Sequence, residues 1–182
     1  MPPSSRKYLA LLRGINVGGR HKVPMADLQK QLAKLGVTGI VTLLNSGNVV
    51  FDAPETDIDT LESKIAAHLE KSFGFPVPVL LRSAEEILRI QHLDPFKSIE
   101  VTKDTRFYVS FLKKVPTVGI KLPWASDDES FRILDIRDRT IFSVLDVSVT
   151  GTPDGMEALE RMFGKEITTR NWNTIAKIVS KL

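Results

Sequence analysis

The chain has 182 residues, of which 42% are hydrophobic and 26% charged, and its formal net charge is +3. This length suits one large domain or two small ones, with an apolar core that needs no disulfides. Because the sequence contains no cysteine, disulfides, thiolate metal sites and cysteine nucleophiles are excluded.

The sequence also lacks the features of a membrane or secreted protein. No apolar stretch approaches the roughly 20 residues that cross a bilayer. Residues 1–7 lack the apolar core of a signal peptide, and we expect them to form a short disordered lead-in. A cytoplasmic location is the resulting expectation.

The first half of the chain alternates apolar runs with two helical stripes. Its predicted elements are a strand at 8–12, a helix from Pro24 to Gly36, strands at 40–44 and 49–51, a helix at 58–73 and a strand at 77–81. Pro24 suits a helix start, Gly74 suits a helix end, and Thr56 with Asp59 resembles a capping box. This β-α-β-β-α-β order predicts an α+β fold whose first unit, residues 1–82, is ferredoxin-like.

The predicted topology brings distant segments together at one edge of the sheet. A right-handed crossover makes the first two strands parallel, so both end at the same edge. The loop after the first strand and the hairpin after the second therefore lie there together. Since the third strand is expected to pair antiparallel with the first, we expect Asn48 near Arg13.

The second half, residues 83–182, is less regular. Its predicted elements are a short helix capped by Ser83 with Glu86, a strand at 107–112, an irregular stretch at 115–130, a hairpin of strands at 131–136 and 141–145, a helix from Thr152 to Gly164, a short strand at Ile167, and a last helix capped by Thr169. We interpret this half as a degraded, related α/β plait unit with a C-terminal helix, packed on the first unit as one compact body.

Unusual polar residues gather in the loop, the hairpin and the start of the last helix. The candidate ligand-binding residues are Arg13, Asn16, Gly18, Gly19, Lys22, Ser46, Asn48, Arg170, Asn171 and Asn173. Guanidinium, amide and exposed backbone N–H groups suit a phosphate or carboxylate, and five cations, including Arg13 and Lys22, precede the first acid, Asp27.

Each of these residues also has a purely structural interpretation. Gly18 and Gly19 allow a turn, Lys22 is solvated, Ser46 belongs to a turn, and Arg170 pairs with an acid such as Glu166. Both interpretations remain open at this point, although Arg13 favours a functional role because it closes an apolar strand.

Several known chemistries do not fit the sequence. The glycine loop lacks the Lys-Ser or Lys-Thr of a P-loop and the spacing of the dinucleotide fingerprint. Ser46 is not in a nucleophile elbow, and no histidine is predicted beside it. The three histidines lack metal-ligand spacing, so no metal or cofactor is expected, and only His21 falls near the predicted edge. Whether the protein is an enzyme stays undecided.

Four strings are distinctive: LLRGINVGG at 11–19, KVPM at 22–25, SGNVVF at 46–51 and TRNWNT at 169–174. Together they resemble a bacterial family labelled as a domain of unknown function, number 1697. The resemblance implies a ferredoxin-like unit followed by a related one, and it implies no established activity. Residues 149–154 depart from the basic glycine-serine-lysine segment that relatives tend to carry before the penultimate helix.

Three functions are consistent with these features. The first is binding of a small anionic ligand at the strand-end edge, with or without catalysis. The second is a nucleic-acid module, although the apolar first and third strands argue against stacking bases on an open sheet. The third is a structural or protein-interaction domain. No membrane partner is expected, and the oligomeric state is not determined.

Overall fold

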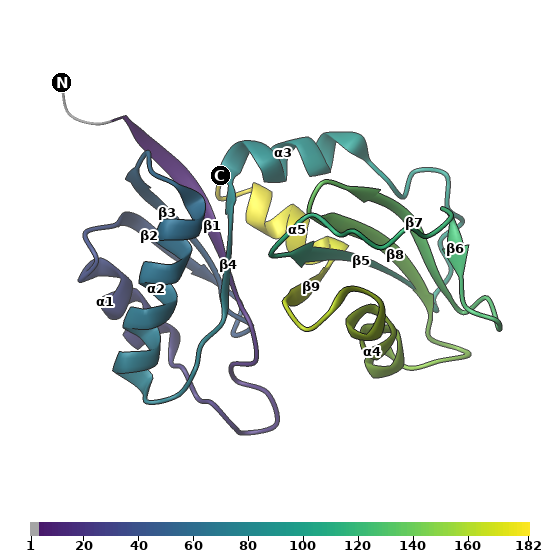
Figure 1. Cartoon of the computed structure of the whole chain (residues 1–182), viewed down its shortest axis with the longest axis horizontal. Coiled ribbons are helices and arrows are strands. Elements are labelled where there is room, and N and C mark those ends of the chain that lie inside the picture. Colours follow the sequence, from purple (N-terminus) through teal and green to yellow (C-terminus); the bar gives the residue numbers. More distant parts are fainter. Residues whose placement is uncertain (1–3) are drawn as a thin grey trace. The chain divides into compact units, whose positions relative to one another are not determined.

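A computed structural model describes residues 4–182. In this part of the chain it contains five helices and two antiparallel sheets, a mixed α+β fold (Figure 1). The chain divides into two compact units, one formed by residues 1–89 with 177–182 and one by residues 90–176. Within residues 4–182, no helix combines the length and the apolar character that a bilayer crossing requires.

The first unit is built on a four-stranded sheet with two helices. Its elements are β1 (Ser5–Leu12), α1 (Met25–Ala33), β2 (Thr38–Leu43), β3 (Asn48–Pro54), α2 (Ile58–Phe73) and β4 (Val79–Ser83). The strand order is β2-β3-β1-β4, and β1 is antiparallel to both of its neighbours. The predicted pairing of the first strand with the third is therefore confirmed.

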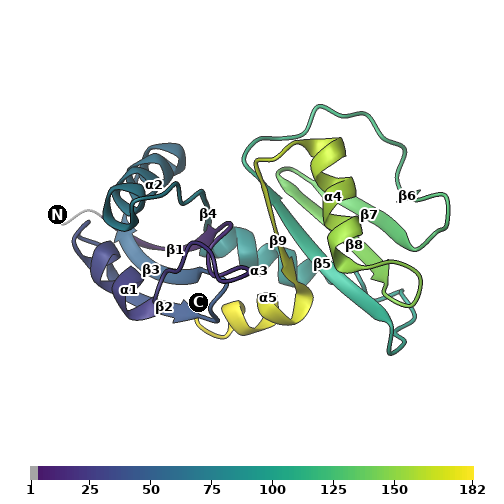
Figure 2. The same ribbon diagram turned by 90° about the horizontal axis from the view of Figure 1, so that it is seen from below.

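One apolar core stabilises this unit. Helices α1 and α2 cover the same face of the sheet (Figure 2), because their apolar stripes face the alternate side chains of β1 and β3. Leu28, Leu32, Ile65 and Leu69 from the helices are fully buried in this core. Gly74 ends α2 in the left-handed conformation, as its position in the sequence predicted.

The second unit has a five-stranded sheet with one covering helix. Its elements are β5 (Thr105–Leu112), β6 (Trp124–Ala125), β7 (Phe131–Arg137), β8 (Thr140–Asp146), α4 (Thr152–Phe163) and β9 (Ile167–Asn171). The strand order is β6-β7-β8-β5-β9. Helix α4 packs through Leu159 on a core that includes Phe131 and Ile133. Two further helices, α3 (Ala84–Leu93) and α5 (Trp172–Val179), include the points where the chain passes between the units.

The two sheets share one arrangement. Their four main strands follow the orders β2-β3-β1-β4 and β7-β8-β5-β9. The residues at the end of each first strand also make matching backbone hydrogen bonds. The Leu12 and Leu112 N–H groups donate to the hairpin residues Gly47 and Arg139, and the N–H groups of the next residues donate to Pro78 and Glu166. No helix follows β5 in the second unit, where the irregular connection with β6 takes the place of α1.

Two local predictions about helix and strand starts are wrong. Residues 5–7 are not a disordered lead-in but the beginning of β1, because Arg6 and Lys7 pair with β3 and form ion pairs with Glu55 and Asp52. Residues 1–3 of that predicted lead-in lie outside the described residues. The N-cap of α2 is Asp57 rather than Thr56, since its carboxylate accepts the Thr60 N–H at 2.8 Å.

The start of the last helix also differs from the prediction. Thr169 and Arg170 belong to β9, where they pair with Ser110 and Val109 of β5. The helix begins only at Trp172, and Asn171 Oδ1 accepts the Asn173 N–H at 2.9 Å. Pairing with β5 extends the strand because the ladder satisfies backbone groups that a helix start leaves open.

Candidate functional site

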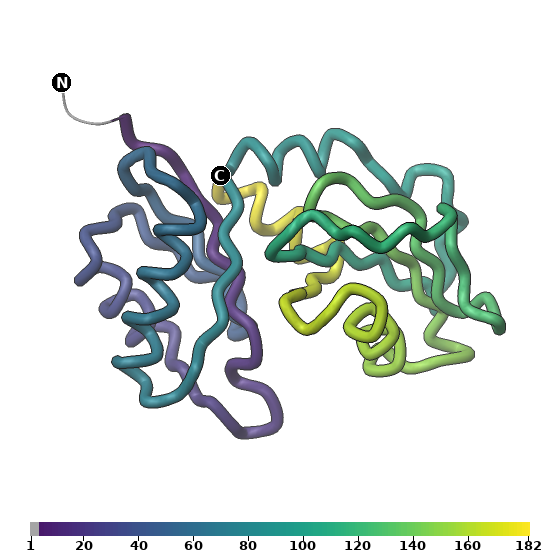
Figure 3. The backbone as a smooth tube through the Cα atoms, in the orientation of Figure 1, coloured from purple at the N-terminus to yellow at the C-terminus, as the bar shows by residue number. Residues whose placement is uncertain are grey.

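The two segments predicted to meet, the loop after β1 and the hairpin after β2, do so at the end of β1, and residue 78 before β4 joins them. The Leu12 N–H donates to Gly47 O at 2.8 Å, and the Arg13 N–H donates to Pro78 O at 2.9 Å. Asn48 pairs with Leu11 in the sheet. We call residues 13–24 and 44–48 together the loop edge, and Figure 3 traces the long excursion that residues 13–24 make before α1.

Asn16 joins the two parts of the loop edge through its side chain. Its amide donates to Val23 O at 3.0 Å and to Asn45 O at 2.8 Å, and its Oδ1 accepts the Val23 N–H at 2.8 Å. The amide therefore closes the base of the long loop and ties it to the hairpin. Asn16, predicted as a ligand contact, is occupied with the protein's own backbone.

Gly18 and Gly19 form the tip of a small hairpin within the loop. Both have positive φ values, 56° and 76°, and the Arg20 N–H donates to Val17 O at 3.1 Å. Two consecutive positive φ values are the signature of a type I′ turn, which glycine adopts without steric cost. This geometry accounts for both glycines as turn formers.

Three residues other than glycine at the loop edge also have left-handed backbone conformations. They are Asn16, His21 and Leu44, with φ values of 55°, 47° and 59°. Such conformations cost free energy, most of all for a side chain such as leucine. Their concentration here indicates that the surrounding contacts impose the shape of this edge.

The loop edge carries several cations and no carboxylate. Residues 13–24 and 44–48 contain Arg13, Arg20 and Lys22 but no aspartate or glutamate. Arg13 is half-buried, whereas Arg20 and Lys22 are exposed and make no ion pair with any residue between 4 and 182. Exposed cations without an ion pair, here Arg20 and Lys22, create a positive potential that attracts anions.

His21 contributes a further polar group, which the sequence indicated only by its position. Its ring stacks on Phe75 with centroids 4.6 Å apart, and its Nδ1 lies 3.2 Å from Gly14 O. Because a carbonyl only accepts, Nδ1 carries the proton and Nε2 is the acceptor of the neutral ring.

Ser46 and Asn48 stabilise the hairpin itself. The Asn48 amide donates to Leu43 O and to Ser46 Oγ, both at 3.0 Å, and its side chain is completely buried. Asn48 thus lies at the predicted place, near Arg13 along the sheet, but faces the protein interior. We leave it out of the set of groups that face a ligand.

The remaining candidates belong to β9 and α5. Arg170 is only 9% exposed, and its guanidinium donates to Thr168 Oγ1 at 2.8 Å and to Thr169 O at 2.9 Å. Burial lowers the pKa of Arg170 to about 10, so it stays charged at neutral pH. Arg170 and Asn171 lie in the unit of residues 90–176, and Asn171 caps α5, whose second residue is Asn173.

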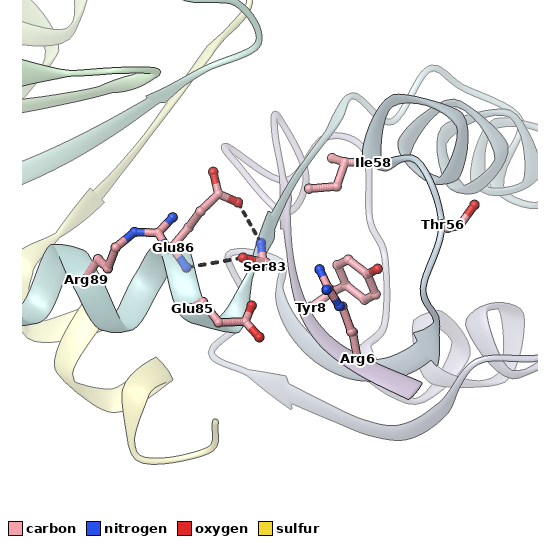
Figure 4. A pocket seen from close by; sticks show the side chains of 8 residues that line it. All are labelled: Arg6, Tyr8, Thr56, Ile58, Ser83, Glu85, Glu86 and Arg89. Atoms are coloured by element: carbon pink, nitrogen blue, oxygen red, sulfur yellow. Dashed lines mark hydrogen bonds between the residues drawn. The ribbon is translucent and has the colours of Figure 1, made fainter. Parts of the chain in front are cut away.

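A cavity of about 490 Å³ lies at the opposite end of β1, and no motif in the sequence indicated it (Figure 4). Arg6 and Tyr8 of β1, Ser83 of β4, and Glu85 and Arg89 of α3 line its walls. Alternation places Arg6 and Tyr8 on one face of a strand, but only the tertiary structure brings α3 beside them. Among residues 4–182, no group of three or more His, Asp or Glu side chains is placed to hold a metal ion.

Comparisons with known proteins identify relatives without a stated activity. A family model described as "Protein of unknown function (DUF1697)" matches residues 6–142. The solved structure of the conserved bacterial protein SP0830 from Streptococcus pneumoniae is similar, with 25% sequence identity and a TM-score of 0.68, over 98% of this chain and 99% of that one. No curated protein matches the chain.

Proposed function

Because this chain belongs to the DUF1697 family, whose description assigns no activity, we propose a function from the loop edge alone. The loop edge binds a small anionic ligand that bears a phosphate or carboxylate group. Arg13, Arg20 and Lys22 supply the positive charge, and His21 supplies a further hydrogen-bonding nitrogen. This proposal does not require that a reaction be catalysed.

The hydrogen bonds of the Asn16 side chain to Val23 and Asn45 are the observation that carries this proposal. These three hydrogen bonds hold the backbone of the loop that carries Arg20 and Lys22. A fixed loop has already lost the conformational entropy that ligand binding would otherwise cost. Arg20 and Lys22 have no ion pair within residues 4–182, so a ligand anion does not have to displace a carboxylate from them.

We also infer that the first unit is ferredoxin-like and the second a related plait that lacks its first helix. The order β1-α1-β2-β3-α2-β4 and the sheet order β2-β3-β1-β4 support this inference. Some proteins with this fold stack RNA bases on aromatic residues of their first and third strands. Tyr8 and Phe51, the aromatic residues of β1 and β3, are buried, which favours a small ligand at the loop edge over RNA on the sheet.

Thermal unfolding in the presence of inorganic phosphate, pyrophosphate, nucleotides and sugar phosphates tests the proposed function. We expect at least one of these anions to raise the Tm, because a ligand that binds only the folded state stabilises it. The doubly substituted variant R20Q/K22Q should lose that rise while keeping the Tm of the free protein, since neither side chain has an internal partner.

Lys34→Gln, which removes an exposed cation at the C-terminal end of α1, is the matched control and should keep the ligand-induced rise. An equal rise in all three proteins would contradict the assignment of the ligand to the loop edge. A rise produced only by short RNA, and lost steeply as salt increases, would favour the nucleic-acid function instead.

A further inference from the structure

The cavity at the start of β1 is built from four elements of the first unit. Tyr8 of β1 lies opposite Ser83 of β4 in the sheet, Ile58 begins α2 with Thr56 just before it, and Glu85 comes from the start of α3 (Figure 4). Its volume of about 490 Å³ falls within the range of small-molecule sites, roughly 300–1,000 Å³. It lies at the end of β1 that begins at Ser5, so it is separate from the loop edge.

Tyr8 provides a hydroxyl in the wall of this cavity. The residue is 2% exposed, and its ring stacks on Phe51 with centroids 5.9 Å apart. Its hydroxyl makes no hydrogen bond within residues 4–182 and is not among the fully buried polar atoms without a partner, so it is accessible from the cavity. The hydroxyl of the other tyrosine, Tyr108, has a partner, since it lies 2.9 Å from Thr152 Oγ1.

Four charged side chains line the walls, and two of them, Arg6 and Glu86, have close partners in the protein. Arg6 forms an ion pair with Glu55 at 2.7 Å. Glu86 accepts the Ser83 N–H at 2.8 Å, while the Glu86 N–H donates to Ser83 Oγ at 3.2 Å, which completes a capping box at the start of α3. The prediction of this capping box is confirmed.

Glu85 and Arg89 are exposed and opposite in charge. Neither forms an ion pair within the described chain, but the positive charges of Arg6 and Arg89 both act on the Glu85 carboxyl. Hydrogen bonds from its own N–H and from the Ser83 hydroxyl lower the pKa of the Glu85 carboxyl, which is therefore ionised at neutral pH. Four residues apart on one helix, the two side chains share a face, with roughly 5–6 Å between their Cβ atoms.

This charge distribution disfavours a simple anion. A helix start attracts anions through its open N–H groups and its dipole. At α3, however, the Ser83 hydroxyl and the carboxylates of Glu85 and Glu86 already occupy that position. An added anion would also face Glu85 at close range.

We propose that this cavity binds a small zwitterion of the α-amino-acid class. The ligand ammonium faces Glu85, its carboxylate faces Arg89, and a polar group of the ligand hydrogen-bonds to the Tyr8 hydroxyl. The charges of an α-amino acid are close enough together to match a pair of residues four apart on a helix. This second site does not depend on the function proposed for the loop edge.

The two tyrosines make a direct test possible. In protein with isotope-labelled tyrosine rings, NMR shows one set of ring signals for Tyr8 and one for Tyr108, assigned through Tyr8→Phe and Tyr108→Phe. When the common L-α-amino acids are added one at a time, we expect at least one to move the Tyr8 signals saturably while the Tyr108 signals stay in place. If none does so at millimolar concentration, the proposal is wrong.

Ligand analogues and variants test each assigned contact. The amine and the carboxylic acid derived from the best amino acid, each lacking one charge, should bind at least about tenfold more weakly, as should the amino acid with Glu85→Gln or Arg89→Gln. Glu70→Gln, on an exposed position of α2, is the control and should leave the affinity unchanged. If the carboxylic acid binds as tightly as the amino acid, the cavity is an anion site and the assignment of Glu85 is wrong.

Discussion

At the scale of single residues, the loop edge depends on positions where few side chains are tolerated. Gly47 has a φ of 79°. The adjacent Asn48 is completely buried, and its side chain forms hydrogen bonds within its own hairpin. The Asn16 side-chain amide donates hydrogen bonds to backbone carbonyls of two segments, at Val23 and Asn45. These residues shape the loop edge, whereas the side chains of Arg20 and Lys22 are exposed and contribute positive charge.

Gly47→Ala should destabilise the protein by roughly 1–3 kcal/mol. A Cβ at this position would lie 2.7 Å from Leu12 Cβ and 2.8 Å from Ile15 Cδ1, and the positive φ adds strain. Denaturant unfolding measures the loss. Gly119→Ala, where nothing lies within 4 Å of the added Cβ, is the control and should be nearly neutral. Equal effects at the two positions would contradict the steric argument.

Two buried serines in the second unit should respond to alanine in opposite directions. Ser143 Oγ is buried without a hydrogen bond in the described chain, so Ser143→Ala should raise the free energy of unfolding by about 1 kcal/mol. Ser110 Oγ lies 2.7 Å from Thr169 Oγ1, so Ser110→Ala should lower it by a similar amount. Chemical denaturation of both variants checks the pair, and a loss of stability in Ser143→Ala would indicate a partner for its hydroxyl.

At the scale of elements, caps decide where helices begin and strand pairing decides where they do not. Asp57 starts α2, the Ser83–Glu86 box starts α3, and Asn171 starts α5. Thr169 does not cap a helix because it is paired with Ser110 in a sheet. The same residue types therefore serve as caps or as strand residues according to whether a neighbouring strand is available.

Asp57 should make part of the stability dependent on acid pH. Hydrogen bonds from the Thr60 hydroxyl and N–H lower its pKa in the folded protein below the ordinary 3.8. Its contribution is therefore fully present above this ordinary value and is lost as the pH falls through the lowered folded-state pKa. Asp57→Asn, which keeps the cap without the titration, should reduce the slope of the unfolding free energy against pH in the acid range. An unchanged slope would contradict this role.

At the scale of the whole molecule, each unit has its own apolar core. Ile65 and Leu69 lie in the core of the first, and Leu159 and Ile133 in that of the second. The matching strand orders and matching backbone hydrogen bonds at Leu12 and Leu112 indicate one architecture used in both. In the first unit, β1 is followed by a loop with a small hairpin at its tip and then by α1, whereas β5 of the second unit is followed by an irregular connection and β6. The loop after β1 is the larger part of the loop edge.

Leu159→Ala should destabilise the second unit by roughly 2–5 kcal/mol, because Leu159 is almost completely buried and its loss leaves a cavity. Both tryptophans, Trp124 and Trp172, lie within residues 90–176, so their fluorescence reports on the unfolding of this unit. The fluorescence transition should therefore move to lower denaturant concentration. The exposed substitution Glu157→Ala on the same helix should leave it in place.

Local sequence patterns predicted most of the elements and their order, but not β6 or the full extent of β9. The signals that mark these elements are local: apolar periodicity marks the helices, Pro24 precedes one helix, and Gly74 and Gly164 end two others. Helix positions can therefore be predicted from neighbouring residues alone. The family was predicted from four short strings, and the comparison confirms it. The meeting of Arg13 with the hairpin was also predictable, since chain order and the handedness of crossovers leave few topologies.

The role of each polar group, by contrast, depends on how the chain folds. Whether Asn48 faces solvent, whether Arg170 sits in a strand or a helix, and whether the Tyr8 hydroxyl finds a partner depend on residues far away in the chain. Hydrogen bonding and burial are set by these distant neighbours, and a local pattern does not specify them. For this reason the sequence located the loop edge but gave no sign of the cavity beside Tyr8.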